Sequence, residues 1–260
     1  MKKLLWLIPL LCSLAWGQGG VISGNGKISG SGVIGGRATA TSPAFVKYTF
    51  AEWSGVSKTL LDNNANNADK VSYGSNLGST HLLVCGSDFS NTASTALSMT
   101  DGLSLTYTQA SGSPYVGNDL LGFFTAPTSG GGADGTLQLS WTTGATYSTM
   151  ACLEYSGAAT SSPTDGTCTA SASAVTTWSC NVTTSFTNDT IVTVCSNSVA
   201  GSTMLAGTGE TGRAGGTISG GGNGFLVEEM TTTTAGVYTT NCKSSGSGNA
   251  TLFSVAIKHP

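Results

Sequence analysis

The chain has 260 residues, a formal net charge of −3 and only 9% charged residues. Its 13 acidic and 10 basic side chains argue against nucleic-acid binding, which needs a basic surface to neutralise phosphates. Because about a quarter of the residues in globular proteins are charged, this surface must rely instead on serine, threonine, asparagine and glycine, as the surfaces of exported β-proteins do.

Residues 1–17 have the layout of a secretory signal peptide. Two lysines precede an apolar core from Leu4 to Trp16, and Gly17 marks the expected cleavage point. The core is too short to span a membrane, and no later stretch reaches the ~20 apolar residues that a span needs. We therefore expect a secreted or cell-surface bacterial protein without a membrane span.

Residues 18–44 form a glycine-rich arm with a hexad pattern. Ile22, Ile28 and Ile34 stand six apart in the sequence, so an extended strand would place them on one face and mostly polar residues on the other. Such a strand could complete the sheet of its own domain or that of another subunit. The alternative is a flexible linker, which is favoured unless a partner offsets the conformational entropy that ordered glycines lose.

Beyond the arm, short apolar runs alternate with turn residues. "AFVKYTFAEW" (44–53) alternates like a half-buried strand, whereas "THLLVCG" (80–86) and "TIVTVCS" (190–196) are typical of central strands covered on both faces. Asp101-Gly102 predicts a hairpin turn. The best helical candidate, residues 57–70, contains an asparagine cluster that favours a loop. Further strands are expected in "LLGFF", "TLQLSW", "YSTMACLEY", "TTWSCNVTT", "GFLVEEM", "GVYTTNC" and "TLFSVAIK".

About a dozen strands without crossover helices predict an all-β fold, an antiparallel β-sandwich or jelly roll preceded by the extended arm. We place a single domain at residues 45–260, because one β-sandwich can exceed ~200 residues. The glycine-rich stretches at 128–135 and 206–224 are interpreted as insertions in loops.

All cysteines except Cys12 lie beyond the signal peptide, and their even number in an exported chain predicts disulfides. A metal site is not expected, because the chain lacks a Cys-x-x-Cys motif and has two histidines. Sequence alone cannot fix the connectivity. The strand pattern favours Cys168–Cys180 across a hairpin, Cys85–Cys195 between two similar apolar strands, and Cys152–Cys242 between a central and a late strand.

Several motifs together resemble a β-sandwich module of secreted bacterial proteins. They are "HLLVCGSDF", "SMTDGLSLTYT", "LEYSGAATSSPTDG", "NDTIVTVCSNS" and "YTTNC…GSGNATLFSVAIK", within residues 75–258. The shared pattern is an apolar strand, a T-D turn before a tyrosine strand, E-Y-S-G before S-P-x-D, and a late N-D-aliphatic strand. The resemblance implies a secreted β-sandwich, and the module has no established activity to carry over.

The sequence contains no recognisable catalytic set. A nucleophilic triad needs a base beside its nucleophile, yet His81 opens an apolar strand, His259 is the penultimate residue, and no G-x-S-x-G motif occurs. A glycosidase needs two facing carboxylates. Glu154 could be joined by only one of Glu228 and Glu229, since neighbours in a strand face opposite ways. We expect Glu154 to cap a hydrogen-bonded turn instead.

The sequence leaves two ligands as alternatives, a structural calcium ion and a glycan. The acidic and asparagine-rich segment from Asp62 to Asp69, and Asp165 in "SPTDG", offer oxygens for a structural calcium ion, although such loops usually bond to their own backbone. No other cofactor is expected. A glycan would stack on exposed aromatic rings, and Tyr115 is the one we expect to be exposed. Tyr115 and Glu154 are therefore the candidate ligand-binding residues.

Two classes of function follow. The first is a non-catalytic structural or adhesive subunit, secreted or on the cell surface, that assembles into homo-oligomers or filaments through residues 18–44. The second is a carbohydrate-binding module for extracellular glycans, with a jelly-roll glycosidase or lyase as a third alternative. The missing catalytic set favours a protein that is not an enzyme.

Overall fold

A computed structural model describes residues 27–28, 32–33, 41–54, 59–61, 77–89, 97–131, 137–141, 147–216 and 223–260. The chain separates into two units, Met1–Ala40 and Thr41–Pro260. In the first unit, β1 (Lys27–Ile28) and β2 (Gly32–Val33) pair with each other in antiparallel orientation. Because β1 and β2 run in opposite directions, they are not parts of one straight strand through Ile28. Ile22 and Ile34 lie outside the described residues.

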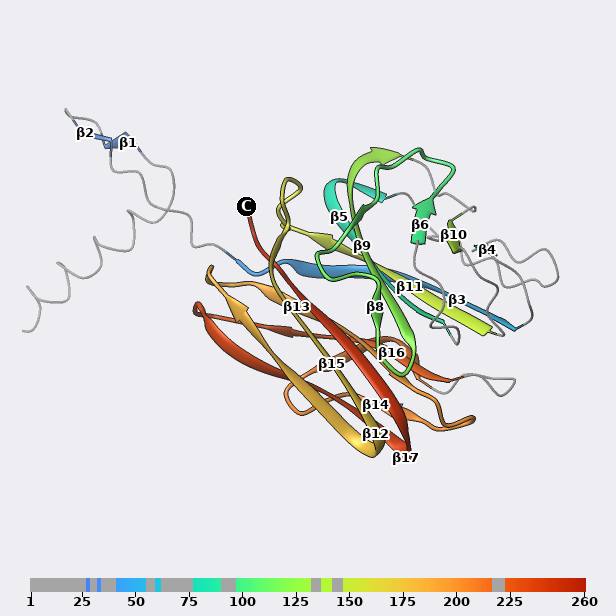
Figure 1. The fold of residues 1–260 in the computed structure, drawn as a ribbon. Helices are drawn as coiled ribbons and strands as arrows, with labels where there is room; N and C mark the ends of the chain where they lie inside the picture. Colours follow the sequence, from blue (N-terminus) through green and yellow to red (C-terminus); the bar gives the residue numbers. More distant parts are fainter. Residues whose placement is uncertain are drawn as a thin grey trace, which may run out of the picture. The chain divides into compact units, whose positions relative to one another are not determined.

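The second unit is all-β in its described residues, and its antiparallel sheets pack face to face as a β-sandwich, which confirms the expected fold class (Figure 1). The first sheet has the strand order β3-β11-β5-β9-β7, with β8 also paired to β9. Its strands are β3 (Ala44–Ser54), β5 (Leu77–Phe89), β7 (Thr108–Gln109), β8 (Tyr115–Val116), β9 (Leu120–Gly131) and β11 (Tyr147–Ser156).

The second sheet has the strand order β12-β17-β13-β16-β15, with β14 also paired to β17. Its strands are β12 (Thr164–Thr184), β13 (Thr190–Asn197), β14 (Met204–Leu205), β15 (Thr211–Gly216), β16 (Gly224–Thr231) and β17 (Gly236–Ile257). A separate three-stranded sheet has the order β4-β10-β6 and consists of β4 (Thr59–Leu61), β6 (Leu97–Thr100) and β10 (Gln138–Trp141).

The main core lies between the two large sheets. Alternate residues of β5 and β13 point into it, among them Leu82 and Val84 from the first sheet and Val192 and Val194 from the second. The other alternate residues are also buried, because Leu83 and Cys85 join the cluster that packs beneath β6 and β10. Both faces of these strands are thus covered. The continuous apolar runs at 80–86 and 190–196 are central strands, as predicted.

The outer face of the second sheet is covered by its own longest strands, which fold back on themselves. β12 pairs with β17 along two arms, and the register shifts between them around Ala174, which has a positive φ of 57°. The fold-back brings Thr240 and Ser254, both on β17, to 2.8 Å between their hydroxyl oxygens. Residues 177–184 of β12 and 236–243 of β17 therefore form an additional layer over the sheet, which we call the folded arm.

The predicted hairpin at Asp101-Gly102 is wrong. β6 ends at Thr100 and pairs with β10, not with the segment that follows. The Asp101 carboxylate instead accepts hydrogen bonds from the Leu105 backbone at 3.0 Å and from the Tyr107 hydroxyl at 2.8 Å. These bonds of Asp101 stabilise a loop wider than a hairpin turn, and β6 pairs with β10.

A search of the described residues for helices long and apolar enough to cross a membrane found none.

Candidate functional site

Three disulfides form among the described residues: one joins neighbouring strands of the first sheet, and two tie the folded arm of β12 and β17 to the second sheet. They are Cys85–Cys152, Cys168–Cys180 and Cys195–Cys242. The Cys168–Cys180 pairing is as predicted, although it joins the two arms of the folded β12 and not the two strands of a hairpin. Three disulfides fit an extracellular protein.

The predicted pairings Cys85–Cys195 and Cys152–Cys242 are wrong, because the two cysteines of each pair lie on opposite outer faces of the sandwich. Cys85 lies on the outer face of the first sheet, directly opposite Cys152 on β11, with 4.0 Å between their Cα atoms. Cys195 lies on the outer face of the second sheet, where the folded arm of β17 brings Cys242 to it. The whole sandwich core separates Cys85 from Cys195.

Glu154 lies on the outer face of the first sheet and is buried. Its Oε1 accepts hydrogen bonds from the Gly78 backbone and from the His81 ring, each at 2.7 Å, and its Oε2 lies 3.5 Å from Lys47 Nζ. The expected turn-capping role is therefore wrong, because Glu154 lies within β11 and connects it to β3 and β5. The nearby Thr128 hydroxyl bonds to backbone groups of Gly78 and His81 and not to the imidazole.

The structure does not bring the predicted carboxylates together. Glu154 and Glu228 lie on opposite outer faces of the sandwich, and Glu229 points into the interior, where it bonds to Tyr155 and Arg213. The geometry of a glycosidase pair is therefore not formed between Glu154 and either of these glutamates.

Tyr115 is not the exposed aromatic that the sequence suggested. It is only half exposed, because it packs against the main core from β8. Trp178 is buried under the folded arm of the second sheet, and the side chain of Trp141 lies outside the described residues. Trp178 therefore offers no open ring face on which a sugar would stack, and the Tyr115 ring is partly covered.

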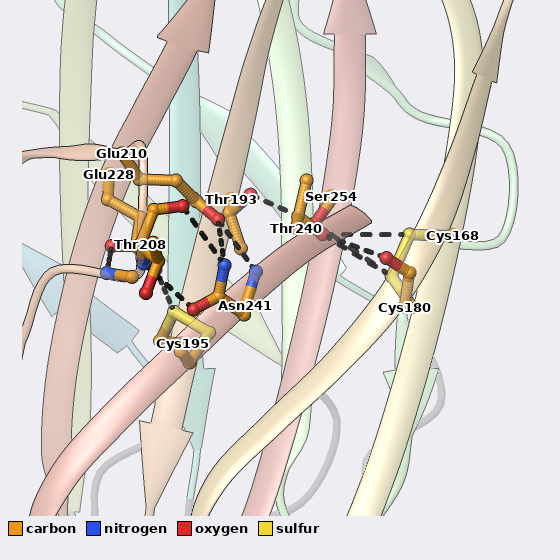
Figure 2. The surroundings of a disulfide bond; sticks show 12 residues. Cys168, Cys180, Thr193, Cys195, Thr208, Glu210, Glu228, Thr240, Asn241 and Ser254 are labelled. Carbon is orange, nitrogen blue, oxygen red and sulfur yellow. Dashed lines mark hydrogen bonds between the residues drawn. A yellow bond between two sulfur atoms is a disulfide. The ribbon is translucent and has the colours of Figure 1, made fainter. Parts of the chain in front are cut away.

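Two glutamates, the buried Glu228 and the half-buried Glu210, gather beside the Cys195–Cys242 disulfide, between the second sheet and its folded arm (Figure 2). Glu228, on β16, places its Oε1 2.9 Å from Cys195 Sγ and accepts the Gly207 backbone N–H at its Oε2, 2.7 Å away. Glu210 accepts the Asn241 backbone N–H at 2.6 Å. Burial and then the charge of Glu210 raise the pKa of Glu228 to about 9, and burial raises the pKa of Glu210 to about 7.

A second carboxyl pair lies between the two large sheets. Asp88 at the end of β5 and Asp119 before β9 are both buried, and both face Ser196 on β13. Ser196 Oγ lies 2.9 Å from Asp88 Oδ2 and 2.9 Å from Asp119 Oδ2. Asn223 donates to Asp119 Oδ1 at 2.9 Å and reaches Asp88 Oδ2 at 3.4 Å. Burial raises the pKa of both aspartates, and the charge of Asp119 raises that of Asp88 further.

β3 is the terminal strand of the first sheet. Among the described strands its ladder runs only to β11, over the full length of β3, which leaves its other edge without a partner there. Val46 and Tyr48 on this strand are 45% and 52% exposed. The chain enters β3 through Pro43, which is buried and whose carbonyl accepts a hydrogen bond from Thr190 at 3.0 Å.

One group of metal-binding residue types comes together within the described ranges, namely Cys195, Cys242 and Glu228, with ligand atoms within 4.8 Å of one another. The two sulfurs form a disulfide and are not thiolates, the form in which cysteine binds metals. The segment Asp62–Asp69 lies outside the described residues. The Asp165 carboxylate lies at the start of β12 and accepts the backbone N–H groups of Ser185 and Phe186, which follow the far end of that strand.

Sequence reasoning missed both carboxyl pairs. Glu210 stands in a glycine-rich stretch interpreted as a loop insertion, and Asp88 and Asp119 are single acids that end or precede apolar runs. The one sequence signal for a buried carboxyl was an acidic residue directly beside an apolar run that was expected to be buried. Comparison of the chain with protein-family models, with curated proteins and with solved structures found no match.

Proposed function

We propose that this protein is a non-catalytic, secreted structural or adhesive subunit that assembles with further copies by strand addition, the N-terminal arm of one copy pairing with the β3 edge of the next. The observation that carries the proposal is the long edge of β3, unpaired among the described strands, with two exposed apolar side chains on it. Natural proteins usually shorten, charge or cover such an edge, because it pairs readily with another chain.

The composition of the two long terminal strands, β3 and β12, favours β3 as the acceptor. The exposed residues of β12 are serine, threonine, alanine and asparagine, and register shifts interrupt its ladder. β3 has 11 residues, one register shift, and the exposed Val46 and Tyr48. An incoming strand would therefore bury apolar surface on β3, in addition to forming main-chain hydrogen bonds.

The arm is a suitable donor in sequence and in length. Residues 18–40 suffice to cover β3 and still connect to the domain, and isoleucines at every sixth position would share one face. The two-residue ladders of β1 and β2 do not oppose this, because an isolated two-stranded hairpin is marginal in water. Pairing with a full edge would supply many more main-chain hydrogen bonds.

Secretion is part of the proposal. It rests on the signal-peptide layout of residues 1–17 and on the three disulfides, which form and persist in oxidising compartments. The low content of charged residues fits a surface that is meant to associate.

The test compares the mature chain from residue 18 with a variant that begins at residue 41, by sedimentation velocity and electron microscopy over a range of concentrations. We expect oligomers or filaments from the first and monomers from the second. Replacing Ile22, Ile28 and Ile34 by Asp should also give monomers, whereas the same change at Asn25, Ser29 and Ser31 on the opposite face should not.

The acceptor edge has its own matched pair of variants. Val46→Lys with Tyr48→Lys should prevent assembly, whereas Val237→Lys, at a valine that is 66% exposed on β17, should leave it intact. A mature chain that stays monomeric at every concentration would contradict the proposal. Binding of that monomer on a glycan array would favour the carbohydrate-binding alternative.

A further inference from the structure

We propose that protons held by two largely buried carboxyl pairs lock the layers of this domain together, so that it is built for an acidic medium and loosens as the pH rises. One pair, Asp88 and Asp119, joins the two large sheets. The other, Glu210 and Glu228, joins the second sheet to its folded arm. The inference does not depend on the proposed assembly, since it concerns a single domain.

Hydrogen counting at Ser196 requires a proton on the aspartate pair. The serine hydroxyl has one hydrogen, yet its oxygen lies 2.9 Å from a carboxyl oxygen of each aspartate. It can donate to one of them only. The other contact is favourable only if that carboxyl is protonated and donates to Ser196, because two unprotonated oxygens at this distance would repel. Asn223 supplies N–H groups to both carboxyls but no proton to share.

Hydrogen counting at Cys195 gives the same result for Glu228. Its Oε1 lies 2.9 Å from a disulfide sulfur, which has no hydrogen to donate. The other oxygen, Oε2, already accepts the Gly207 N–H. We therefore assign the contact with sulfur, which Figure 2 draws, to an O–H donated by a protonated Glu228. Glu210 lies close enough for its negative charge to favour that proton.

The groups that face each pair do not supply a compensating cation of comparable effect. Ser196 and Asn223, which face the aspartates from the second sheet, are neutral. The charge of Lys243, in the folded arm, lowers the pKa of Glu228, but burial and the charge of Glu210 raise it by more. The Lys243 ammonium donates to the Thr208 hydroxyl at 2.8 Å. Glu210 receives neutral donors only, from Asn241 and Thr193.

The direction of the pH effect follows from linkage. Burial raises the pKa of Glu228 to about 9 and of Glu210 to about 7, and raises that of both aspartates, whereas exposed carboxyls of an unfolded chain titrate near 4. The folded state therefore binds more protons between these values. For each such proton, the unfolding equilibrium constant rises up to about tenfold per pH unit. Stability is greatest in acid and is lost as the pH rises towards 7 to 9.

The experiment measures urea midpoints of the oxidised mature protein between pH 4 and pH 9. The variants are Glu228→Gln and Asp119→Asn, whose amides can donate where the protonated acids donate, without titrating. Glu229→Gln is the matched control, because this neighbour of Glu228 faces the interior and is satisfied as a carboxylate by Tyr155 and Arg213. The infrared band of protonated carboxyls, recorded at pH 7, gives a second readout.

We expect the wild-type midpoint to fall from pH 5 to pH 9. Glu228→Gln and Asp119→Asn should each reduce that fall and exceed the wild type at pH 9, whereas Glu229→Gln should lower the midpoint at all pH values and keep the slope. The infrared band should be present in the wild type and weaker in both pair variants. A midpoint that is constant or rises with pH, or pair variants with the wild-type slope and band, would overturn the inference.

Discussion

Gly86 on β5 lies directly against Val194 on β13, across the centre of the sandwich. A Cβ atom added to Gly86 would stand 2.3 Å from Val194 Cγ2, a distance at which atoms cannot remain without movement. The two sheets therefore approach closely where the first has no side chain. This contact fixes the spacing of the central strands, which carry Cys85 and Cys195 on their outer faces.

We therefore predict that Gly86→Ala destabilises the domain by about 1–3 kcal/mol, the usual cost of overpacking a filled core. Val194→Ala should relieve much of that cost, so that the double variant is less destabilised than the sum of the single variants. Urea unfolding of the three variants at one pH measures the coupling. Additive effects within error would show that Gly86 and Val194 do not control the spacing of the sheets.

The Cys85–Cys152 disulfide should contribute more stability than Cys168–Cys180. The first closes a loop with a sequence separation of 67 and the second one of 12. On the chain-entropy model these loops correspond to about 4 and about 3 kcal/mol. We predict that replacing Cys85 and Cys152 together by alanine lowers the free energy of unfolding by about 4 kcal/mol.

The paired Cys168→Ala and Cys180→Ala variant is the comparison for this disulfide, measured by urea unfolding with mass spectrometry to verify the remaining bonds. An equal or larger loss in that variant would mean that unfolded-chain entropy does not dominate, and that the folded arm depends on its own cross-link for a different reason.

The central strands were predicted well, because a strand that is buried on both faces has a continuous apolar run in the sequence. Every residue from Leu82 to Phe89 is buried, as is every residue from Thr190 to Asn197. A continuous apolar run is the pattern that such a strand must have. The connectivity of Cys85 and Cys195 could not be predicted in this way, because it depends on which sheet each strand joins and which face then points outward.

The fold-back of β12 and β17 could not be predicted from the sequence either. The bend at Ala174 lies in an alanine- and serine-rich stretch with neither proline nor glycine to mark it. The Glu210–Glu228 pair was missed because it forms through the pairing of β15 with β16, which places Gly212 opposite Glu228, and β15 lies in a stretch interpreted as a loop. Pairing and layering between segments, and not local propensity, create both features.

Tyr155 should be the most sensitive of the tyrosines with a described environment. It is fully buried, and its hydroxyl donates to Glu229, which also pairs with Arg213. Phenylalanine at this position would leave a buried carboxylate oxygen without a donor, which typically costs about 1–3 kcal/mol. We predict a loss of this size for Tyr155→Phe in urea unfolding.

Tyr48→Phe is the control for Tyr155→Phe, because that side chain is 52% exposed and its hydroxyl can bond to water. It should change the stability by less than about 0.5 kcal/mol. Equal effects of the two substitutions would contradict the assignment of the Tyr155 hydroxyl as the partner of Glu229.

Asp189 provides a separate test of pH dependence at the entry to β13. Burial, followed by the proximity of Asp165, raises the pKa of Asp189 to about 7, and Lys258 opposes this only in part. The folded state therefore favours a proton on Asp189 that the unfolded chain releases at lower pH. Its contribution to stability is present in acid and is lost as the pH rises through about 7.

We predict that Asp189→Asn removes this loss, because asparagine carries no charge beside Asp165 at any pH. The variant should equal the wild type near pH 4 and be more stable at pH 9, as judged by urea midpoints. Asp101→Asn is the control, since the Asp101 carboxylate accepts two hydrogen bonds and its replacement should destabilise the domain at both pH values. If Asp189→Asn is less stable than the wild type at pH 9, the Asp189 carboxylate must be favourable in the folded protein, and the repulsion from Asp165 is too weak to matter.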